Sequence, residues 1–171
     1  MGSTSCYQKN FRRHFTSINM ALPNVFDKSD VDQILSRIDE LTPESKRLWG
    51  KMGIAEMLAH LNVTYELVYE NKHPQPNFLM KWVMKTFVKK HIVNEIPYQA
   101  NIATAPYFII KDTRDFETEK KRLKDFILRT QELGEIHFAG KESHAFGNLT
   151  ATEWNNMFYK HLDHHLRQFD V

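Results

Sequence analysis

The sequence predicts an all-α protein built on a four-helix bundle. Apolar residues recur at helical spacing in five separate segments, and no segment reads as a β-sheet. Phenylalanine is abundant, with 12 residues, whereas glycine is scarce, with only 6, which favours a packed helical core. The 171 residues are enough for one domain, and their 42% hydrophobic and 26% charged content is ordinary for a globular protein.

The first bundle helix is expected to begin shortly after Asp27, with Ser29 or Asp30 as its N-cap, and to break before Pro43. The second is expected to run from about Ile54 to Glu70, where a proline-rich stretch ends it. The apolar stripes comprise Val31, Ile34, Leu35, Ile38 and Leu41 in the first helix, and Ile54, Met57, Leu58, Leu61, Tyr65 and Val68 in the second. Both stripes follow the period expected of helices that face a core.

A helix of another kind is expected over residues 77–92. Lysines repeat every four residues along one side, and apolar residues fill the other side without any acid. Such a helix either packs on the domain with a solvated lysine face, which we favour, or lies on a membrane surface. The long segment 94–112 that follows is either a lid or pocket wall or a plain surface loop, with "YFII" as a short extended piece.

The two remaining bundle helices carry clear end signals. The third is expected to begin at Asp115 and to end before Gly134, which suits the position after a helix C-terminus. Residues 134–148 are expected to form a loop. Thr150 and Glu153 have the form of a capping box, and the last helix should continue from there to about Gln168.

The bulk composition limits the classes of partner. The net charge of +2 is too small a bias to argue for nucleic acid or for an acidic substrate. No apolar run approaches the roughly 18 residues that a membrane span requires. The single cysteine, Cys6, excludes both an intrachain disulfide and a thiolate zinc cage, so any metal ligands should be His, Asp or Glu. We expect a cytoplasmic protein.

Residues 1–21 differ in composition from the rest and are assigned to a leader or disordered tail. The stretch "MGSTSCYQKNFRRHFTSIN" has four basic or titratable nitrogen side chains and no acid. This composition fits a transit peptide, but a disordered tail or an overlong start with Met20 as the true initiator is favoured. The helical domain is therefore placed at residues 22–171.

Histidines lie on the apolar face of the last helix. At about 100° per residue, His161 and His165 share this face with Trp154 and Phe158 and are one turn apart. Two such imidazoles can chelate one ion, with a third ligand from a facing helix. His60 is the candidate, because it is the only other histidine within a core-forming helix.

The competing interpretation is a set of neutral, hydrogen-bonded core histidines. Burying imidazoles without partners costs several kcal/mol, and a metal ion offsets that cost. Four residues near the ligands in sequence are candidates for holding them in place, and His164 is expected at the border of the site or facing solvent. The four are Glu56, Asn62, Tyr65 and Gln168.

Two stretches, "LWGKMGIAEMLAHLNVTYE" and "FGNLTATEWNNMFYKHLDHHLRQF", resemble blocks of the DinB/YfiT-like superfamily, and within it a bacterial branch with a domain of unknown function. The resemblance covers roughly residue 22 to the end. It implies a four-helix bundle in which His60, His161 and His165 hold a divalent metal ion. It also implies that the helix at 77–92 and the loop after it are inserted between the second and third bundle helices.

The superfamily includes thiol-dependent transferases and isomerases, which sets the functional expectation. We expect a metal-dependent enzyme acting on a small molecule, either a thiol-dependent transferase or a hydrolase. Zinc, nickel, iron, manganese or cobalt would serve as the ion, and a low-molecular-weight thiol as a further cofactor. The alternatives are a metal-binding or stress-response protein in which the ion only braces the bundle, and a metal-free interaction module. The resemblance also suggests a homodimer.

Overall fold

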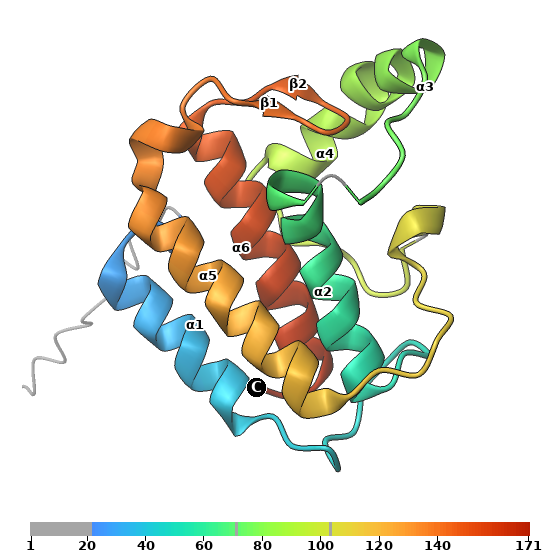
Figure 1. Ribbon diagram of the computed structural model, residues 1–171, viewed down its shortest axis with the longest axis vertical. Coiled ribbons are helices and arrows are strands. Elements are labelled where there is room, and N and C mark those ends of the chain that lie inside the picture. The colour runs from blue at the N-terminus through green and yellow to red at the C-terminus, as the bar shows by residue number, and fades with distance from the viewer. Residues whose placement is uncertain (1–21, 71, 103) are drawn as a thin grey trace, which may run out of the picture.

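The computed structural model describes residues 22–70, 72–102 and 104–171, and it confirms the all-α bundle (Figure 1). The assigned leader at residues 1–21 lies outside the described residues. The bundle helices are α1 (Lys28–Glu40), α2 (Ile54–Tyr69), α5 (Phe116–Phe138) and α6 (Ala151–Gln168). Between α2 and α5 the chain forms α3 (Phe78–Val83), the π-helical turn η1 (Met84–Val88), α4 (Lys89–Val93) and the 3-10 turn η2 (Pro106–Phe108).

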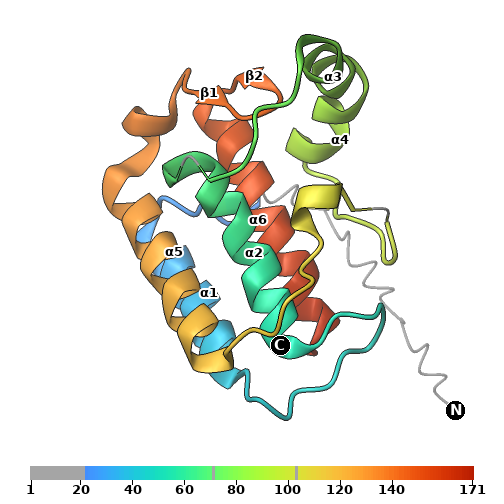
Figure 2. The same cartoon turned by 45° about the vertical axis from the view of Figure 1, so that its right-hand side comes forward.

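Helix α2 is the most deeply buried element of the bundle. Every side chain from Met57 to Glu66 is buried, as expected for a helix covered on all sides. Tyr65 stacks between Phe126 of α5 and Phe158 of α6, with ring centroids 5.6 and 5.1 Å away. These parallel rings fix the spacing of three helices, so α2 and α6 are held side by side along the length that carries the histidines (Figure 2).

The helix ends follow local hydrogen-bonding rules. The capping box at Thr150 is confirmed, because its hydroxyl accepts from the Glu153 N–H while the Glu153 carboxylate accepts from the Thr150 N–H. The expected N-cap of α1 was wrong by two or three positions. Asp27 is the N-cap, and its carboxylate accepts hydrogen bonds from the backbone N–H groups of Ser29 and Asp30, the two residues that were expected to be the cap.

The expected loop at 134–148 is only partly a loop. Gly134 has a positive φ of 68°, in keeping with its expected role after a helix, but another helical turn follows it and ends at Phe138. The Phe138 side chain is fully buried against the aromatic core, which draws this extra turn onto the bundle. A short antiparallel hairpin then pairs β1 (Glu142–Ser143) with β2 (Gly147–Asn148), although the sequence predicted no strand.

The segment between α2 and α5 departs most from expectation. The favoured packing of the 77–92 helix on the domain holds only for its C-terminal part. Helix α4 contacts α6, and Val93 packs against the core, whereas the large apolar side chains of α3 and Phe87 of η1 are exposed. The "YFII" stretch begins in the 3-10 turn η2 rather than in an extended piece, because Pro106 favours a turn at this point. Among the described helices, none is long and apolar enough to cross a membrane.

Candidate metal centre

The structure brings together the three histidines that the sequence singled out. His60 extends from α2 toward His161 and His165 on α6, and its Nε2 lies 2.9 Å from Nε2 of His161. One nitrogen from each ring lies within 4.8 Å of the others, so a single metal ion can be held among them. His60 is 4% exposed and His165 6%, whereas His161 is half-buried, so the cluster lies mostly inside the protein and one ring reaches its edge.

The remaining nitrogen of each ring has its own partner. Nδ1 of His60 lies 2.9 Å from the backbone oxygen of Phe108, and Nδ1 of His165 lies 2.8 Å from Oε1 of Gln168. Because a carbonyl oxygen only accepts hydrogen bonds, these two Nδ1 atoms carry protons and the other nitrogens keep free lone pairs. Nδ1 of His161 lies 2.8 Å from the Thr64 hydroxyl, whose oxygen can accept a hydrogen bond from it in the same way. This pattern is typical of imidazoles that bind a metal through one nitrogen.

The cluster is electrostatically prepared for a cation. Burial lowers the pKa of His60, and burial together with the neighbouring imidazoles lowers the pKa of His161 well below its ordinary value. Burial, followed by the charge of His60, lowers the pKa of His165 to about 3. All three rings are therefore neutral at pH 7. A neutral imidazole can offer a lone pair to a metal, so a divalent ion would bind where the three rings meet.

Aromatic side chains surround the cluster. The Phe108 ring packs on His60 and His161, with centroids 5.1 and 5.6 Å away, and so covers one side of the site. His164 lies at its edge, half-buried, with its ring 4.9 Å from that of His165. It also packs near Trp49 and Tyr98, at 5.8 and 5.9 Å. The expectation that His164 borders the site is in keeping with this position.

Of the four residues considered for holding the ligands, only Gln168 does so. Its amide nitrogen donates to the backbone oxygen of Trp49, 2.8 Å away, which turns Oε1 toward His165. Glu56 instead caps the N-terminus of its own helix. Asn62 donates to a carboxylate on α5, and Tyr65 belongs to the aromatic stack of the core.

Sequence reasoning missed Thr64 and Phe108. Thr64 follows His60 by four residues, so the helical period alone would have placed both on one face. The contribution of Phe108 is a backbone oxygen and a covering ring from a loop far along the chain, and no sequence pattern marks either. The loop at 94–112 thus supplies a wall of the site, one of the two roles considered for it.

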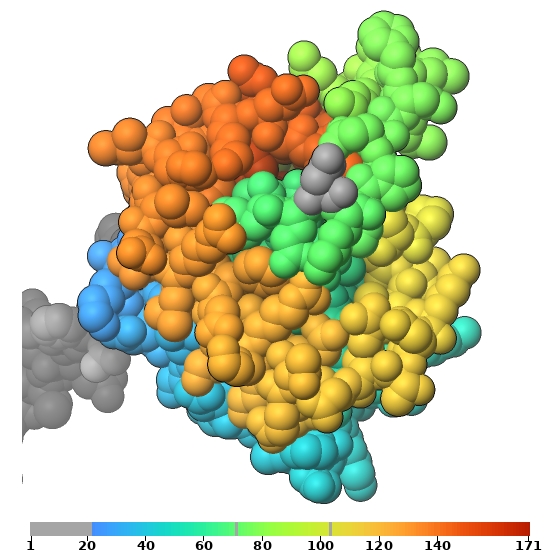
Figure 3. Space-filling view, viewed as in Figure 1, coloured from blue at the N-terminus to red at the C-terminus, as the bar shows by residue number. Residues whose placement is uncertain are grey.

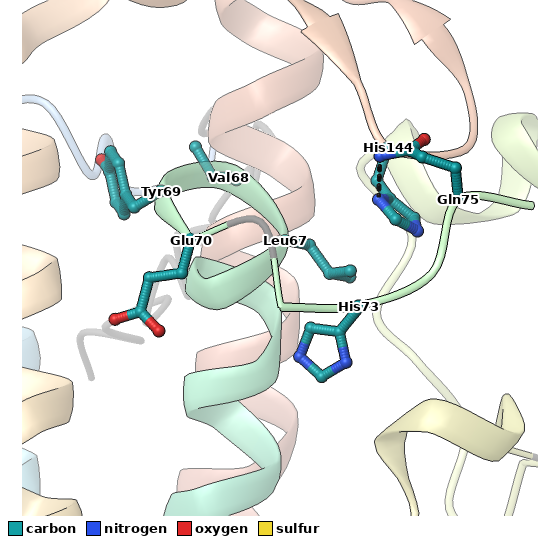
Figure 4. Close-up of a pocket in the computed structure, with 7 residues that line it drawn as sticks. All are labelled: Leu67, Val68, Tyr69, Glu70, His73, Gln75 and His144. Carbon is teal, nitrogen blue, oxygen red and sulfur yellow. Dashed lines mark hydrogen bonds between the residues drawn. The ribbon is translucent and has the colours of Figure 1, made fainter.

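A second hollow lies at the C-terminal end of α2, away from the histidine cluster (Figure 4). Its volume is about 180 Å³, and it is lined by Leu67, Val68, Tyr69, Glu70, His73, Gln75 and His144. Gln75 is 3.1 Å from His144 of the hairpin, and His73 is 2.6 Å from a Glu66 oxygen. Glu70 pairs with Arg122 of α5 at 3.1 Å, and among the described residues no three groups of this hollow converge as metal ligands.

Comparison with known proteins identifies one family. The model of a family described as "Protein of unknown function (DUF1569)" matches residues 21–171. No curated protein and no solved structure matches the chain. The match does not extend to the DinB/YfiT-like superfamily, so that relationship stays a prediction from the sequence.

Proposed function

The chain belongs to the DUF1569 family, and from its site we propose that it is a metal-dependent enzyme acting on a small molecule. His60, His161 and His165 would be the ligands of one divalent ion. The observation that carries this proposal is the convergence of three neutral imidazoles, two of which have their remote nitrogen fixed by a carbonyl oxygen. A merely structural set of core histidines does not require three free lone pairs to meet at one point.

The ligand chemistry narrows the choice of ion. Imidazole nitrogen suits zinc, iron, nickel and cobalt and accepts manganese, whereas magnesium and calcium prefer oxygen ligands. Among the described residues the converging group contains no carboxylate, so the ion would keep its full double charge. Three protein ligands also leave coordination positions open, as in catalytic rather than structural zinc sites.

The reaction we propose is thiol-dependent transfer, with hydrolysis as the alternative outcome of the same site. A divalent ion held by neutral ligands lowers the pKa of a bound thiol or water toward neutrality, which both reactions require. The Phe108 ring excludes water from one side, and Thr64 and Gln168 orient the ligands. Burial lowers the pKa of His164, so this half-buried ring at the border is neutral at pH 7 and able to accept a proton.

Elemental analysis of the purified chain tests the metal ligands. We expect one ion per chain after reconstitution, and loss of that ion in each of the variants His60→Gln, His161→Gln and His165→Gln. His164→Gln is the matched control, because it removes an imidazole from the same helix without removing a ligand. Absence of stoichiometric metal after reconstitution would leave a metal-free helical module and reject the proposal.

A panel of low-molecular-weight thiols with electrophiles, together with ester and amide substrates, tests the reaction. Turnover should require the ion and should disappear in His161→Gln. One observation favours a second candidate, in which the ion only braces the bundle: the ligands join α2 to α6, and two of the three, His60 and His165, are buried. In that case chelation lowers the melting temperature while no substrate is turned over. The homodimer suggested by the resemblance stays a prediction for sedimentation velocity.

A further inference from the structure

The segment between α2 and α5 exposes an apolar surface that the bundle leaves uncovered. We call residues 77–93, which form α3, η1 and α4, the projecting arm. In two views α3 stands clear of the bundle beyond the hairpin (Figures 1 and 2), and the space-filling view shows the arm as a knob at the edge of the molecule (Figure 3). Its large exposed side chains are Phe78, Leu79, Met80, Trp82 and Phe87, of which Phe78 is 86% exposed.

The π-helical turn η1 gathers two of these aromatic rings on one side. In a regular α-helix, residues five apart lie about 140° apart around the axis. The wider turn at Met84–Val88 brings Phe87 against Trp82, with centroids 5.9 Å apart and rings nearly perpendicular. π-Helical turns are often found at functional sites, and here the turn enlarges an apolar surface that faces solvent.

The arm is also basic. It carries four lysines, and residues 71–94 of the sequence contain no acid. Lys89 pairs with Glu153 of α6 at 2.9 Å, which ties the base of the arm to the bundle. Lys85 and Lys90 are exposed, and within the described part of the chain neither forms an ion pair. The end of the Lys85 side chain, including its Nζ, passes close to Gly147 of the hairpin.

We propose that the projecting arm docks the protein onto an anionic membrane surface. Phe78, Leu79 and Trp82 would enter the boundary between headgroups and acyl chains, while Lys85 and Lys90 would face the lipid phosphates. Aromatic residues with lysines at their border are typical of helices that lie in this interface, and tryptophan is enriched there. The arm lies on the membrane in this arrangement, in agreement with the lack of a spanning helix among the described residues.

Shape and charge favour lipid over the other occupants. The arm is a convex projection, and a fluid lipid surface accepts such a projection without a complementary groove. A second copy docked arm to arm would bring the unpaired lysines of both copies together, and like charges across an interface oppose association. The inference does not depend on the metal centre, because no residue of the projecting arm belongs to that site.

Flotation of the full-length protein with vesicles tests the apolar part. We expect binding to vesicles of mixed phosphatidylcholine and phosphatidylserine, little binding to phosphatidylcholine alone, and release at high salt. The double variant Phe78→Ser/Trp82→Ser should lose binding. The matched control Leu48→Ser/Ile136→Ser removes two apolar side chains that are exposed elsewhere and should bind normally. Thermal melts should be unchanged in both, since all four side chains already face solvent.

The basic part is tested with Lys85→Gln and Lys90→Gln. Each lysine near an anionic bilayer contributes about a fivefold increase in partitioning, so each variant should bind about fivefold more weakly at low salt. Lys121→Gln is the control, because Lys121 is an exposed lysine on α5 whose partner lies on its own helix. The dependence on salt should weaken in the two arm variants and persist in the control.

Several results would overturn the proposal. Equal binding by the arm variants and their controls, or no vesicle binding by the wild-type chain, would do so. Binding that survives the arm substitutions but disappears on removal of residues 1–19 would assign the lipid contact to the basic N-terminal stretch. A concentration-dependent dimer that forms without lipid and is abolished by Phe78→Ser/Trp82→Ser would show that a second copy occupies the arm.

Discussion

A divalent ion should raise the melting temperature of the chain, because it would join α2 to α6. His60 lies on one of these helices and His161 and His165 on the other, so the full ligand set exists only in the folded state. An ion that binds only the folded chain adds about 2.7 kcal/mol at a free concentration one hundred times its Kd. For a domain of about 150 residues, each kcal/mol raises Tm by about 2–4 °C, so we expect an increase of about 5–11 °C.

Differential scanning calorimetry of chelated and reconstituted protein measures this increase. His161→Gln should abolish it, because two ligands on separate helices hold an ion much less tightly than three. His164→Gln should keep it, although the altered residue lies only three positions further along α6. An increase of equal size in both variants would locate the ion elsewhere in the chain and refute the reasoning. So would an unchanged Tm in a wild-type protein shown to contain the ion.

Three further perturbations probe the surroundings of the site. Burial lowers the pKa of His165 to about 3, so the unfolded chain takes up a proton below about pH 6.5 that the metal-free folded chain refuses. The contribution of His165 to the free energy of unfolding should be constant above about pH 6.5 and should fall below it, by about 2 kcal/mol at pH 5. Urea melts of metal-free His165→Gln should not show this decrease. Lys160→Met removes three hydrogen bonds to residues 91, 92 and 94 and should cost about 2 kcal/mol and speed limited proteolysis there. In Gly50→Ala the new Cβ would lie 2.6 Å from Nε2 of Gln168, so competition with a chromophoric chelator should show metal binding about 10–100-fold weaker. Gly140→Ala has the same φ of 79° with no neighbour within 4 Å and should bind normally.

The histidine cluster was predictable because its signals are local. The spacing of His161 and His165 and their place on an apolar stripe depend only on the period of one helix. His60 could be added because it lies within another helix that faces the core. Gln168 also lies within one turn of its partner. The distance between α2 and α6 could not be predicted, since it is set by the stacking of Tyr65 of α2 between Phe126 of α5 and Phe158 of α6.

The errors have a common physical origin in tertiary packing. The pattern of residues 77–92 correctly predicted helical structure. The expectation that the apolar face of this helix packs on the domain assumed that such a face must meet the core. The structure leaves most of that face exposed, and the π-helical turn within it has no signature in the sequence. Likewise, Gly134 signalled the end of a regular helix, but burial of Phe138 adds another turn. The Phe108 oxygen at the site depends on how a loop lies against α2.

The exposure of the projecting arm raises the question of what holds it in place. Its attachment is mostly polar and comes mainly from one face of α6, and Val93 at its end also packs against the core. Lys89 pairs with Glu153, the Asn156 amide donates to the backbone oxygen of Val93 at 2.9 Å, and Lys160 donates to the backbone oxygens of residues 91 and 92. The last carbonyl groups of α4 have no partner within their own helix, so an ammonium group is a suitable donor to them.

This attachment explains how a buried lysine is tolerated beside the metal ligands. Burial lowers the pKa of Lys160 to about 8, which still leaves it protonated at pH 7, and it lies directly before His161 in the chain. Its side chain points toward the arm, and that of His161 points toward α2. Adjacent positions on one helix diverge by about 100°, so the same turn of α6 can hold a cation-binding cluster on one face and a cation on another. The groups that hold the arm and two of the three candidate ligands therefore lie on the same helix, so α6 sets the position of the arm relative to the candidate metal centre.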